Sequence, residues 1–595
     1  MSIISRITDH IVKAGTVCFN TSFPIAQINL EPTRPDVKGD LTLVVFPLVR
    51  LSKRSPEDTA QEIGRFLLQH IPEIASFNVI KGFLNLCFTD GYFLDQTCQW
   101  LGAPISERID SKESRRIVIE FSSPNTNKPL HLGHIRNNLL GFSLSRLLMA
   151  NGHQVYRVNL VNDRGIHICK SMLAWLKWGN GETPEKSGIK GDHLVGKYYV
   201  LFDQYYKEEA AALMASGVEE KEVMQQSSLM EEARQMLRQW EANDAKTRSL
   251  WEMMNNWVYE GFTATYHQLG IDFDKIYYES QTYQLGKVLV QEGLDMGVFQ
   301  KRQDGSVWVD LRDEGLDEKL LLRADGTSVY ITQDIGTAQL RHDDYEADEL
   351  VYVVGNEQNY HFDVLQKVMA RLGREWSQRI RHYSYGMVEL PHGRMKSREG
   401  TVVDADDLMA EMLQTARKRT EELGKLEDLQ GDEATELFRI VGLAALKYYI
   451  LKVDPKKTMT FNPEESVDFN GNTGPFIQYT YARIRSVQRK ADSMEIQARV
   501  PAPGFNIEDE EKELLKWIML FQDRLEEAGS AYSPALIANY AYDLAREFNQ
   551  FYQSCPILKA DSIERRAYRL ALAVLTAETL KYALWILGIE VPERM

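Results

Sequence analysis

The first hundred residues alternate between helical and strand-like hydrophobic patterns. Ile3, Ile4, Ile7 and Ile11 recur at the spacing of one helix face, which predicts a helix at the start of the chain. The apolar run LTLVVFPLVRL follows, and then a helix near SPEDTAQEIGRFLLQHI. The stretch FNVIKGFLNLCFT alternates as a strand does. These elements predict a separate α/β domain over residues 1–112, and the polar stretch SERIDSKESRR predicts a linker at its end.

A different pattern begins at Arg116. The β-rich run IVIEF is followed by SSPNTNKP, where proline disfavours a helix. From Leu132 an amphipathic helix is predicted by apolar residues at helical spacing, and Asn-Gly at 151–152 ends it. The run HQVYRVNLV then reads as a second strand. Strand, helix and strand within about forty residues predict a βαβ crossover, and therefore a parallel sheet.

The remaining patterns predict mostly helix. Residues 170–260 are charged and helical, as expected for a solvated insertion. Asp-Gly pairs at 304–305 and 325–326 lie beside β-rich runs and predict hairpins. A buried strand is predicted at ELVYVVG, before the loop NEQNYHF, and residues 406–595 form one helical pattern after another. We therefore expect a split α/β domain at 113–405, with an inserted helical and connective region at about 170–325, and an all-α domain at 406–595.

Composition adds little to this picture. The net charge of −16 argues weakly against a nucleic-acid partner, although a basic stripe can lie on an acidic body. Five cysteines without short paired spacing indicate reduced thiols of an intracellular protein. No apolar run approaches the roughly 20 residues of a membrane span, so a cytoplasmic protein with no membrane partner is expected.

Two histidines in the string EFSSPNTNKPLHLGHIRNN are the main candidates for chemistry. His131 and His134 could meet on one helix face and bind a metal, but a catalytic zinc site typically needs a third ligand and a nearby general base. Only Glu120 lies close in sequence, so we expect no metal site in the protein. His131 could also cap the helix, but this explains neither Gly133 nor Lys128.

A nucleotide accounts for all of these residues. Unpaired N–H groups and the positive dipole end at a helix N-terminus favour a phosphate chain. Gly133 would let a base or ribose approach the backbone. His131 and His134 could donate hydrogen bonds to oxygens that gain charge as pyrophosphate leaves, and Lys128 adds a full charge on the same side.

The string HLGH after EFSSPNTNKP resembles the HIGH signature of class I aminoacyl-tRNA synthetases, in the form of the arginyl enzymes. The resemblance covers nearly the whole chain. It implies a split Rossmann-type catalytic domain, an N-terminal domain that recognises the outer corner of tRNA, and an anticodon-binding helical domain. It also implies an arginine–tRNA ligase with ATP, Mg²⁺ bound with ATP, L-arginine and tRNA(Arg) as cofactors and partners. We expect a monomer, and the resemblance implies that arginine activation requires bound tRNA.

The second signature of the class, KMSKS, matches HGRMKSREGTVV at 392–403. The resemblance implies ATP-binding residues at Arg394, Lys396, Ser397 and Arg398, with Lys396 catalytic. Arginine replaces the first lysine of the pattern and serine stands in place of the second. The resemblance implies that Lys128 compensates. A basic surface loop of no catalytic importance is the alternative interpretation.

A guanidinium substrate requires carboxylates and an aromatic face. The runs VYITQDIG and VVGNEQNYH place polar side chains where strands are expected to end, and ligands bind at the carboxyl ends of parallel strands. The resemblance implies an arginine site formed by Glu120 and Asn125 near the ammonium and carboxylate, Tyr330 and Asp334 at the guanidinium, and His131 and Gln358, with His361 nearby. Singly, Tyr330 could be a core aromatic and Asp334 a helix cap.

Two further segments resemble tRNA-contacting parts of the family. In KGFLNLCF, Phe83 and Asn85 would stack on and bond to an unpaired base, although Phe83 could equally be a core residue. In NTGPFIQYTYARIRSVQRK, aromatic and basic residues alternate, and Tyr479, Tyr481, Arg483 and Arg485 are the candidates for anticodon contact. The end of the chain, GIEVPERM, also resembles the family and predicts a terminal methionine packed against the bundle.

Overall fold

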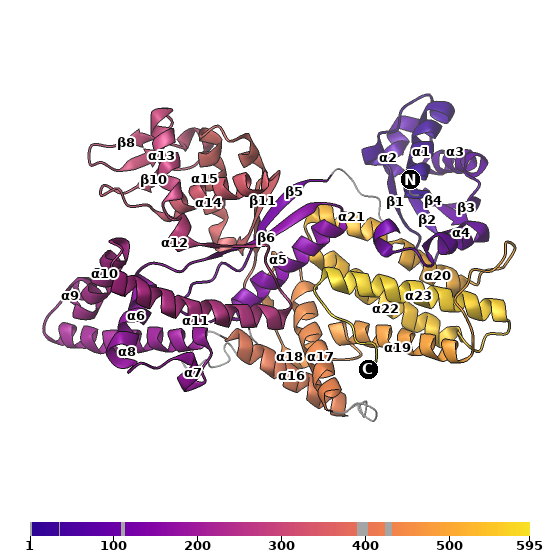
Figure 1. Ribbon diagram of the computed structural model, residues 1–595. Helices are drawn as coiled ribbons and strands as arrows, with labels where there is room; N and C mark the ends of the chain where they lie inside the picture. Colours follow the sequence, from indigo (N-terminus) through magenta and orange to yellow (C-terminus); the bar gives the residue numbers. More distant parts are fainter. Residues whose placement is uncertain (1–2, 35, 109–113, 390–402, 423–430) are drawn as a thin grey trace.

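The computed structural model describes residues 3–34, 36–108, 114–389, 403–422 and 431–595. An N-terminal unit, a central sheet with helical additions, and a C-terminal helical bundle follow one another along the chain (Figure 1). No helix within these described ranges is both long and apolar enough to cross a membrane.

The N-terminal unit packs helices against a four-stranded antiparallel sheet of order β1-β2-β4-β3. Its third helix starts where the sequence dictates, because Ser55 accepts a hydrogen bond from the Asp58 amide at 3.1 Å and Pro56 follows the cap. The elements are α1 (Ile3–Phe19), β1 (Asn29–Pro32), β2 (Leu41–Val44), α2 (Phe46–Ser52), α3 (Pro56–His70), β3 (Ile74–Ile80), β4 (Phe83–Phe88) and α4 (Asp90–Trp100), with short 3₁₀ turns at Ile25–Gln27 and Ile105–Arg108.

The expectation of one strand over FNVIKGFLNLCFT is wrong. The segment forms a hairpin, with β3 and β4 on either side of Lys81-Gly82. Both turn residues have positive φ, 49° and 79°, which is the requirement of a two-residue hairpin turn. Glycine meets this requirement without strain.

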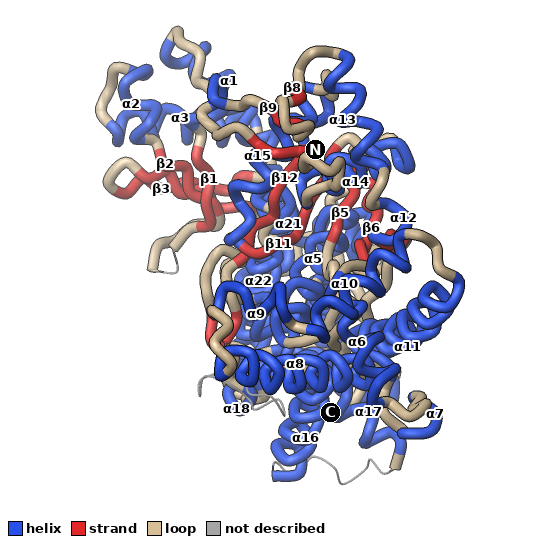
Figure 2. The backbone as a smooth tube through the Cα atoms, turned by 90° about the vertical axis from the view of Figure 1, so that its left-hand side faces the viewer, coloured by secondary structure: helices blue, strands red, loops and turns tan. Residues whose placement is uncertain are grey.

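The central sheet is parallel, five-stranded and ordered β12-β11-β5-β6-β7. Figure 2 shows β11, β5 and β6 side by side above the helical part of the molecule. The predicted βαβ unit is confirmed, with α5 connecting the neighbours β5 and β6. The chain adds strands on one side of β5 and later on the other, so a topological switch point lies between β5 and β11. The strands are β5 (Arg116–Glu120), β6 (Gln154–Val161), β7 (Lys275–Tyr278), β11 (Glu349–Gly355) and β12 (Ile380–Tyr385).

Helices and a small second sheet surround the central one. The charged region is helical as predicted, and Asp304-Gly305 forms the predicted hairpin between β8 and β9. The elements are α5 (Leu132–Ala150), α6 (Ile166–Trp178), α7 (Pro184–Ser187), α8 (Gly191–Ala215), α9 (Glu220–Gln226), α10 (Ser228–Glu241), α11 (Ala245–Leu269), α12 (Glu279–Thr282), α13 (Leu285–Asp295), β8 (Gln300–Lys301), β9 (Val307–Val309), β10 (Lys319–Leu322), α14 (Tyr330–Tyr345), α15 (Asn359–Arg371) and β13 (Val388–Glu389), with 3₁₀ turns at Arg312–Glu314, Asn356–Gln358 and Glu375–Arg379.

The C-terminal region is helical, as predicted, apart from the two-residue strand β14, which pairs with β13. Met595 packs against the core, as the sequence suggested. The elements are α16 (Ala405–Glu422), α17 (Asp432–Leu451), β14 (Met459–Thr460), α18 (Pro463–Ser466), α19 (Gly474–Ser493), α20 (Asp509–Met519), α21 (Phe521–Ala531), α22 (Pro534–Ser554) and α23 (Ile563–Ile586).

Helix α5 lies between the sheet and the bundle, which corrects its prediction as an amphipathic helix. Fifteen of its nineteen residues are buried, including Arg136, Asn137 and Asn138. The protein tolerates the burial of Arg136 and Asn137 because their side chains have hydrogen-bond partners. Arg136 donates to the carbonyls of Met387, Pro455 and Lys457, and Asn137 donates to Val353 O at 2.7 Å. The helix therefore connects the central sheet to the C-terminal domain.

Candidate functional site

The two histidines form a cap at the start of α5. His131 is the N-cap residue in an extended conformation, and its Nδ1 accepts a hydrogen bond from the Gly133 amide at 3.2 Å. His134 Nδ1 in turn accepts from the His131 amide at 3.2 Å. This reciprocal arrangement is a capping box in which imidazoles replace the usual hydroxyl and carboxylate. The capping interpretation from the sequence is therefore confirmed, and it leaves Nε2 of both rings for another role.

Both imidazoles are neutral near pH 7. Burial, together with the charge of Lys128, lowers the pKa of His131 to about 4. Burial also lowers the pKa of His134 well below its usual value. A neutral ring whose Nδ1 accepts a hydrogen bond carries its proton on Nε2. Each histidine can therefore donate one hydrogen bond away from the helix.

Gly133 and Lys128 complete this edge of the site. A Cβ atom on Gly133 would lie 3.0 Å from Cε1 and 3.1 Å from Nδ1 of His131, so glycine leaves room for the imidazole cap itself. Lys128 is half-buried, and burial lowers the pKa of its ammonium. The loop that carries Lys128 packs tightly on α8, where a Cβ on Gly196 would meet Pro129 Cδ at 2.9 Å.

The segment after the predicted basic loop lies against the histidine cap. Leu132 N donates to Val403 O at 2.8 Å, Ala405 N donates to Leu130 O at 3.0 Å, and His131 and Asp404 form a β-bridge. The predicted residues Arg394, Lys396, Ser397 and Arg398 fall outside the described residues. Their roles stay a prediction, but the chain that follows them meets the HLGH segment directly.

Glu120 ends β5 at the switch point, and its carboxylate pairs with the buried guanidinium of Arg341 from α14. Ser123 Oγ donates to its other oxygen at 3.2 Å. Burial raises the pKa of Glu120, and Arg341 opposes that effect. Asn125 is exposed on the following loop, where it bridges Asn162. The predicted ligand of the substrate ammonium thus has a cationic partner within the protein.

Tyr330 and Asp334 lie in the first turns of helix α14, so the expectation that VYITQDIG is a strand running into a loop is wrong. A spacing of four still places both on one helix face. Tyr330 is 82% exposed, so it is not a core aromatic. Asp334 Oδ2 lies 2.6 Å from His361 Nε2, in the first turn of α15. Gln358 is exposed beyond the end of β11, as expected for a residue at a strand end.

Glu279 was not predicted from the sequence. It follows β7 directly, and Gln333 Nε2 donates to its Oε1 at 3.2 Å. Burial raises the pKa of Glu279 to about 7, Arg164 opposes this, and Asp334 is among the charges that raise it. Asp334 acts on Glu120 in the same way. Asp334 thus acts electrostatically on both Glu120 and Glu279, and carboxylates that three elements bring to one region favour a cationic ligand. No motif surrounds Glu279, and only its position at a strand end could have indicated it.

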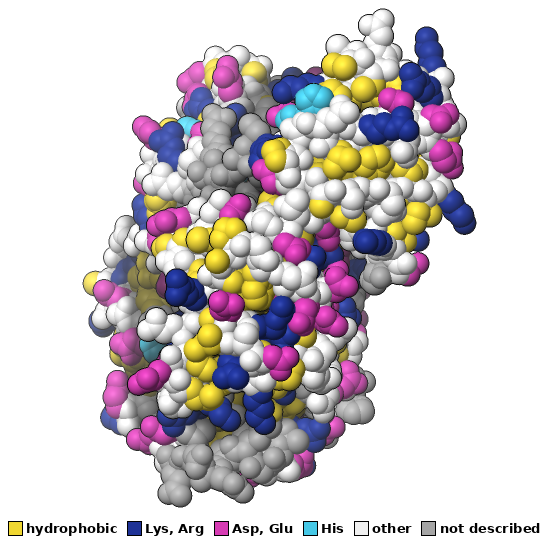
Figure 3. Space-filling model, turned by 90° about the vertical axis from the view of Figure 1, so that its right-hand side faces the viewer, with side chains coloured by type: hydrophobic (Ala, Val, Ile, Leu, Met, Phe, Trp, Pro, Cys, Tyr) yellow, Lys and Arg dark blue, Asp and Glu magenta, His cyan; other side chains and the backbone are white. Residues whose placement is uncertain are grey.

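The predicted tRNA residue Asn85 has internal partners. It is buried, accepts from Thr42 Oγ1 at 2.7 Å and donates to Asn78 Oδ1 at 2.9 Å. Phe83 is half-buried and packs edge-on against the exposed ring of Phe46, with centroids 5.4 Å apart. Figure 3 shows basic and acidic side chains interspersed on the face of the molecule that it presents.

The predicted anticodon residues share helix α19, where two of them hold the end of the chain. Tyr481 OH donates to Glu593 Oε1 at 3.0 Å and Arg485 Nε donates to Glu593 Oε2 at 2.6 Å. Tyr481 is buried, whereas Tyr479 and Arg483 are half-buried, and the Arg483 guanidinium lies over the Tyr479 ring at 4.8 Å.

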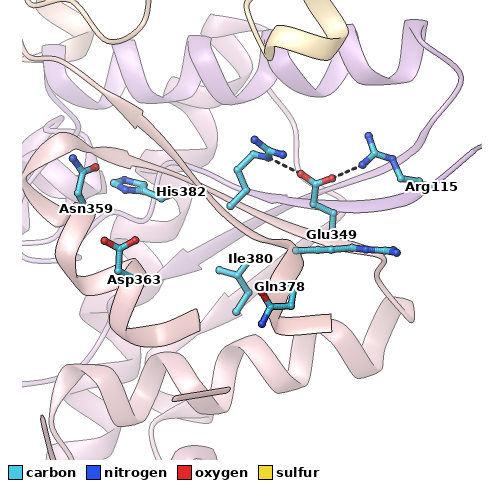
Figure 4. Close-up of a pocket in the computed structure, with 9 residues that line it drawn as sticks. Arg115, Glu349, Asn359, Asp363, Gln378, Ile380 and His382 are labelled. Atoms are coloured by element: carbon cyan, nitrogen blue, oxygen red, sulfur yellow. Dashed lines mark hydrogen bonds and ion pairs between the residues drawn. The ribbon is translucent and has the colours of Figure 1, made fainter. Parts of the chain in front are cut away.

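A cavity of about 610 Å³ lies along the edge strand β12, from Glu349 and Ile380 at the amino ends of β11 and β12 to Asn359 and Asp363 in α15 (Figure 4). Its wall includes Glu349, whose buried carboxylate accepts bonds from Arg115, Arg381 and Tyr532. Ligands of open parallel sheets bind at the carboxyl ends of the strands. The residues that line this cavity include neither the histidine cap nor Glu120, Glu279 and Asp334, so it is separate from the site described above.

Comparisons with known proteins agree with this geometry. The family model for the catalytic domain of class I (R) tRNA synthetases matches residues 101–462, more than half of the chain. An arginine–tRNA ligase of Parabacteroides distasonis is 58% identical, and one of Bacteroides fragilis strain YCH46 is 56% identical, each with full coverage of both chains. The chain belongs to the arginyl-tRNA synthetase family. The predicted resemblance is thereby confirmed.

Two further comparisons concern the helical domain and the fold. The family model of the DALR anticodon-binding domain matches residues 477–595. The arginyl-tRNA synthetase of Thermus thermophilus superimposes with a TM-score of 0.81 over the full length of both chains. At 23% identity that likeness supports the fold alone. The predicted class, a Rossmann-type parallel sheet followed by a helical C-terminal domain, is confirmed.

Proposed function

We propose that this chain is an arginine–tRNA ligase that activates L-arginine with ATP and transfers it to the 3′ end of tRNA(Arg). The observation that carries the proposal is the neutral HLGH cap at the carboxyl edge of the sheet, beside the grouped carboxylates Glu120, Glu279 and Asp334. A cap of this kind suits a phosphate chain, and three carboxylates suit a cationic amino acid.

ATP is proposed to bind over the start of α5. The Nε2–H groups of His131 and His134 would donate to phosphate oxygens, and Gly133 would leave space for the nucleoside. Lys128 would supply a positive charge against the departing pyrophosphate, and the positive end of the α5 dipole would add to it. ATP is expected to arrive as its Mg²⁺ complex, because Mg²⁺ prefers phosphate oxygens and water. Arg394, Lys396, Ser397 and Arg398 are proposed to contact the triphosphate.

Arginine is proposed to bind across the switch point. Glu120 and Asn125 would hold its ammonium and carboxylate, with His131 and Gln358 nearby. Asp334 and Glu279 would receive the guanidinium in a fork of charged hydrogen bonds, and Tyr330 would cover it with its ring. The substrate carboxylate would then attack the α-phosphate in line. Positioning and electrostatics would supply the catalysis without a covalent enzyme intermediate.

The tRNA is proposed to contact both ends of the chain. The N-terminal domain at 1–112 would meet the outer corner of the tRNA through Phe83, with Asn85 supporting that surface from within. The helical domain at 406–595 would meet the anticodon through Tyr479 and Arg483, while Tyr481 and Arg485 fix the nearby chain end. A cytoplasmic location and a monomeric state belong to the same proposal.

ATP–pyrophosphate exchange tests the proposal directly. Exchange is expected with arginine plus an arginine tRNA transcript, and not with lysine in place of arginine. Lys128→Ala should abolish exchange while tRNA binding, measured by filter retention, stays nearly intact. No exchange from a chain that still binds tRNA would instead support a non-catalytic tRNA-binding relative, which the departure of RMKSR from the KMSKS pattern favours.

A further inference from the structure

The first turn of α8 meets the start of α16 beside the histidine cap. His193, in α8, has its Nε2 3.3 Å from Asp404 Oδ2 and 3.3 Å from Asp406 Oδ2. These carboxylates lie more than 200 residues away along the chain. The imidazole thus contacts Asp404 and Asp406 and helps to join the helical insertion to the segment that follows the predicted basic loop.

Asp404 connects this link to His131. Its backbone bridges His131, and the residues on either side of it pair with Leu130 and Leu132. Its carboxylate also caps α16, because the amides of Asp406 and Asp407 donate to Oδ1 at 2.8 and 3.2 Å. Asp404 acts on His131 as a charge that raises the pKa of the ring, against the effects of burial and Lys128.

The cluster resembles a metal site only superficially. Ligand atoms of Asp192, His193 and Asp406 lie within 4.8 Å of one another. However, Lys190 Nζ lies 2.6 Å from Asp406 and 3.2 Å from Asp192, where a cation would have to bind. Thr265 Oγ1 donates to the remaining oxygen of Asp406 at 2.9 Å. The ammonium and the imidazole already neutralise these carboxylates.

The charge state of His193 follows from these neighbours. Burial alone would lower its pKa, but the carboxylates of Asp404 and Asp406, each 3.3 Å from Nε2, raise that pKa to about 10. Burial would raise the pKa of Asp406, but His193 and Lys190 lower it to about 2. The titratable groups around the ring are Lys190, Asp192, Asp404 and Asp406. His193 is therefore an imidazolium near pH 7, and it faces the carboxylates of Asp404 and Asp406.

We propose that His193 is a positioning residue for His131. His193 holds Asp404 in place and neutralises its carboxylate, so that the backbone of Asp404 fixes the HLGH cap. The inference rests on the proposed function, in which His131 binds ATP. Through His193, the insertion that contains α8 helps to position the ATP half of the site. The arginine half is formed by β7 and α14, which contain none of the residues named in this cluster.

Loss of the imidazolium has two consequences for His131. Asp404 loses its contact with α8, while Lys190 still pairs with Asp406, so the segment 403–405 holds the cap less firmly. The carboxylate of Asp404 loses its partner and raises the pKa of the His131 ring. The fold and arginine binding should both persist. A protonated His131 would no longer present the tautomer that caps Gly133. The KM for ATP should therefore rise while the KM for arginine does not, and the loss of activity should be largest at low pH.

The test compares His193→Gln, Asp404→Asn, their combination, and the exposed control His267→Gln on α11. Asparagine keeps the cap of α16 and removes the charge. His193→Gln is expected to lower kcat for exchange by roughly 10- to 100-fold, since small displacements of catalytic groups have effects of that size. KM for ATP should rise and KM for arginine should stay within twofold of the wild-type value. The acidic limb of the pH profile should move to higher pH.

Adding Asp404→Asn to His193→Gln should restore part of kcat and return the acidic limb towards wild type. The proposal is overturned if His193→Gln behaves like His267→Gln, or if both KM values rise together and the double variant recovers nothing. Absence of exchange in the wild-type chain would refute the proposed function instead. In that case NMR titration of ¹³C-labelled His131, assigned with His131→Gln, still decides whether His193 sets its pKa.

Discussion

Glu279 is predicted to make arginine binding depend on pH in the neutral range. Its side chain is only 16% exposed, and burial raises its pKa from 4.5 to about 7. If the guanidinium binds only the ionised carboxylate, the apparent KM for arginine varies as 1 + 10^(pKa − pH). This factor is about 11 at pH 6 and about 1.1 at pH 8, so KM should rise about tenfold between them.

The variant Glu279→Gln should remove this dependence. A neutral amide of the same shape cannot titrate, so KM for arginine should become flat between pH 6 and 8. The loss of a charged hydrogen bond, about 2 kcal/mol, should raise KM roughly 30-fold at pH 8. The assay is tRNA-dependent ATP–pyrophosphate exchange at saturating ATP, with KM for ATP as the internal control.

Glu279→Gln should also stabilise the fold. Because the pKa of Glu279 is higher in the folded chain, ionisation lowers the free energy of unfolding as pH rises from about 4.5 to 7. A pKa raised from 4.5 to about 7 corresponds to about 3 kcal/mol, an upper value for a side chain that keeps some exposure. The gain should be complete at pH 8 and vanish below pH 4.5, as measured by urea unfolding.

Two results would refute this reasoning. A wild-type KM for arginine that stays constant from pH 8 to pH 6 would show that Glu279 does not titrate against the substrate. A Glu279→Gln variant that keeps the wild-type pH slope would place the titrating group elsewhere.

Three further predictions concern single positions. Tyr330→Ala should change the free energy of unfolding by less than about 0.5 kcal/mol, because the side chain is exposed, while KM for arginine rises about tenfold; an unchanged KM would remove Tyr330 from the site. Gly133→Ala should displace the His131 ring and raise KM for ATP about tenfold, with KM for arginine unchanged. A KM for ATP equal to that of the wild-type chain would show that the added methyl group does not displace the ring. Arg136→Lys should lose up to two of three bonds to buried carbonyls and reduce the free energy of unfolding by about 2–3 kcal/mol in urea; a loss below about 1 kcal/mol would show that lysine replaces the guanidinium.

The site was only partly predictable from the sequence. Glu279 lies about 160 residues from Glu120 in a segment, ESQTYQ, that carries no motif. It joins the site because β7 is parallel to β6 at the far side of the sheet. The pairing of Asp404 with His193, and of Glu120 with Arg341, likewise depends on contacts between distant segments. Strand order decides such contacts, and local patterns do not contain it.

The β-rich composition of VYIT was misleading for a related reason. This segment begins α14, which packs so closely on α13 that a Cβ on Gly286 would lie 1.7 Å from Thr332 O. Glycines at 286 and 336 permit that approach, and the buried helix pair outweighs the strand propensity of a few residues. The buried polar face of α5 has the same origin, since its partners come from the sheet and from residues 387 and 455–457.

The sequence by itself determined the local features of this protein. The βαβ unit, the hairpin at Asp304-Gly305, the helical C-terminal region and the HLGH junction all arise from periodicities and turn residues within short windows. Family membership followed from the same strings. The tertiary structure alone decided which carboxylates gather at the switch point, which histidines are neutral and which is charged, and which polar residues are buried. Those properties depend on burial and on charges contributed by other parts of the chain, and these exist only after the distant segments have packed together.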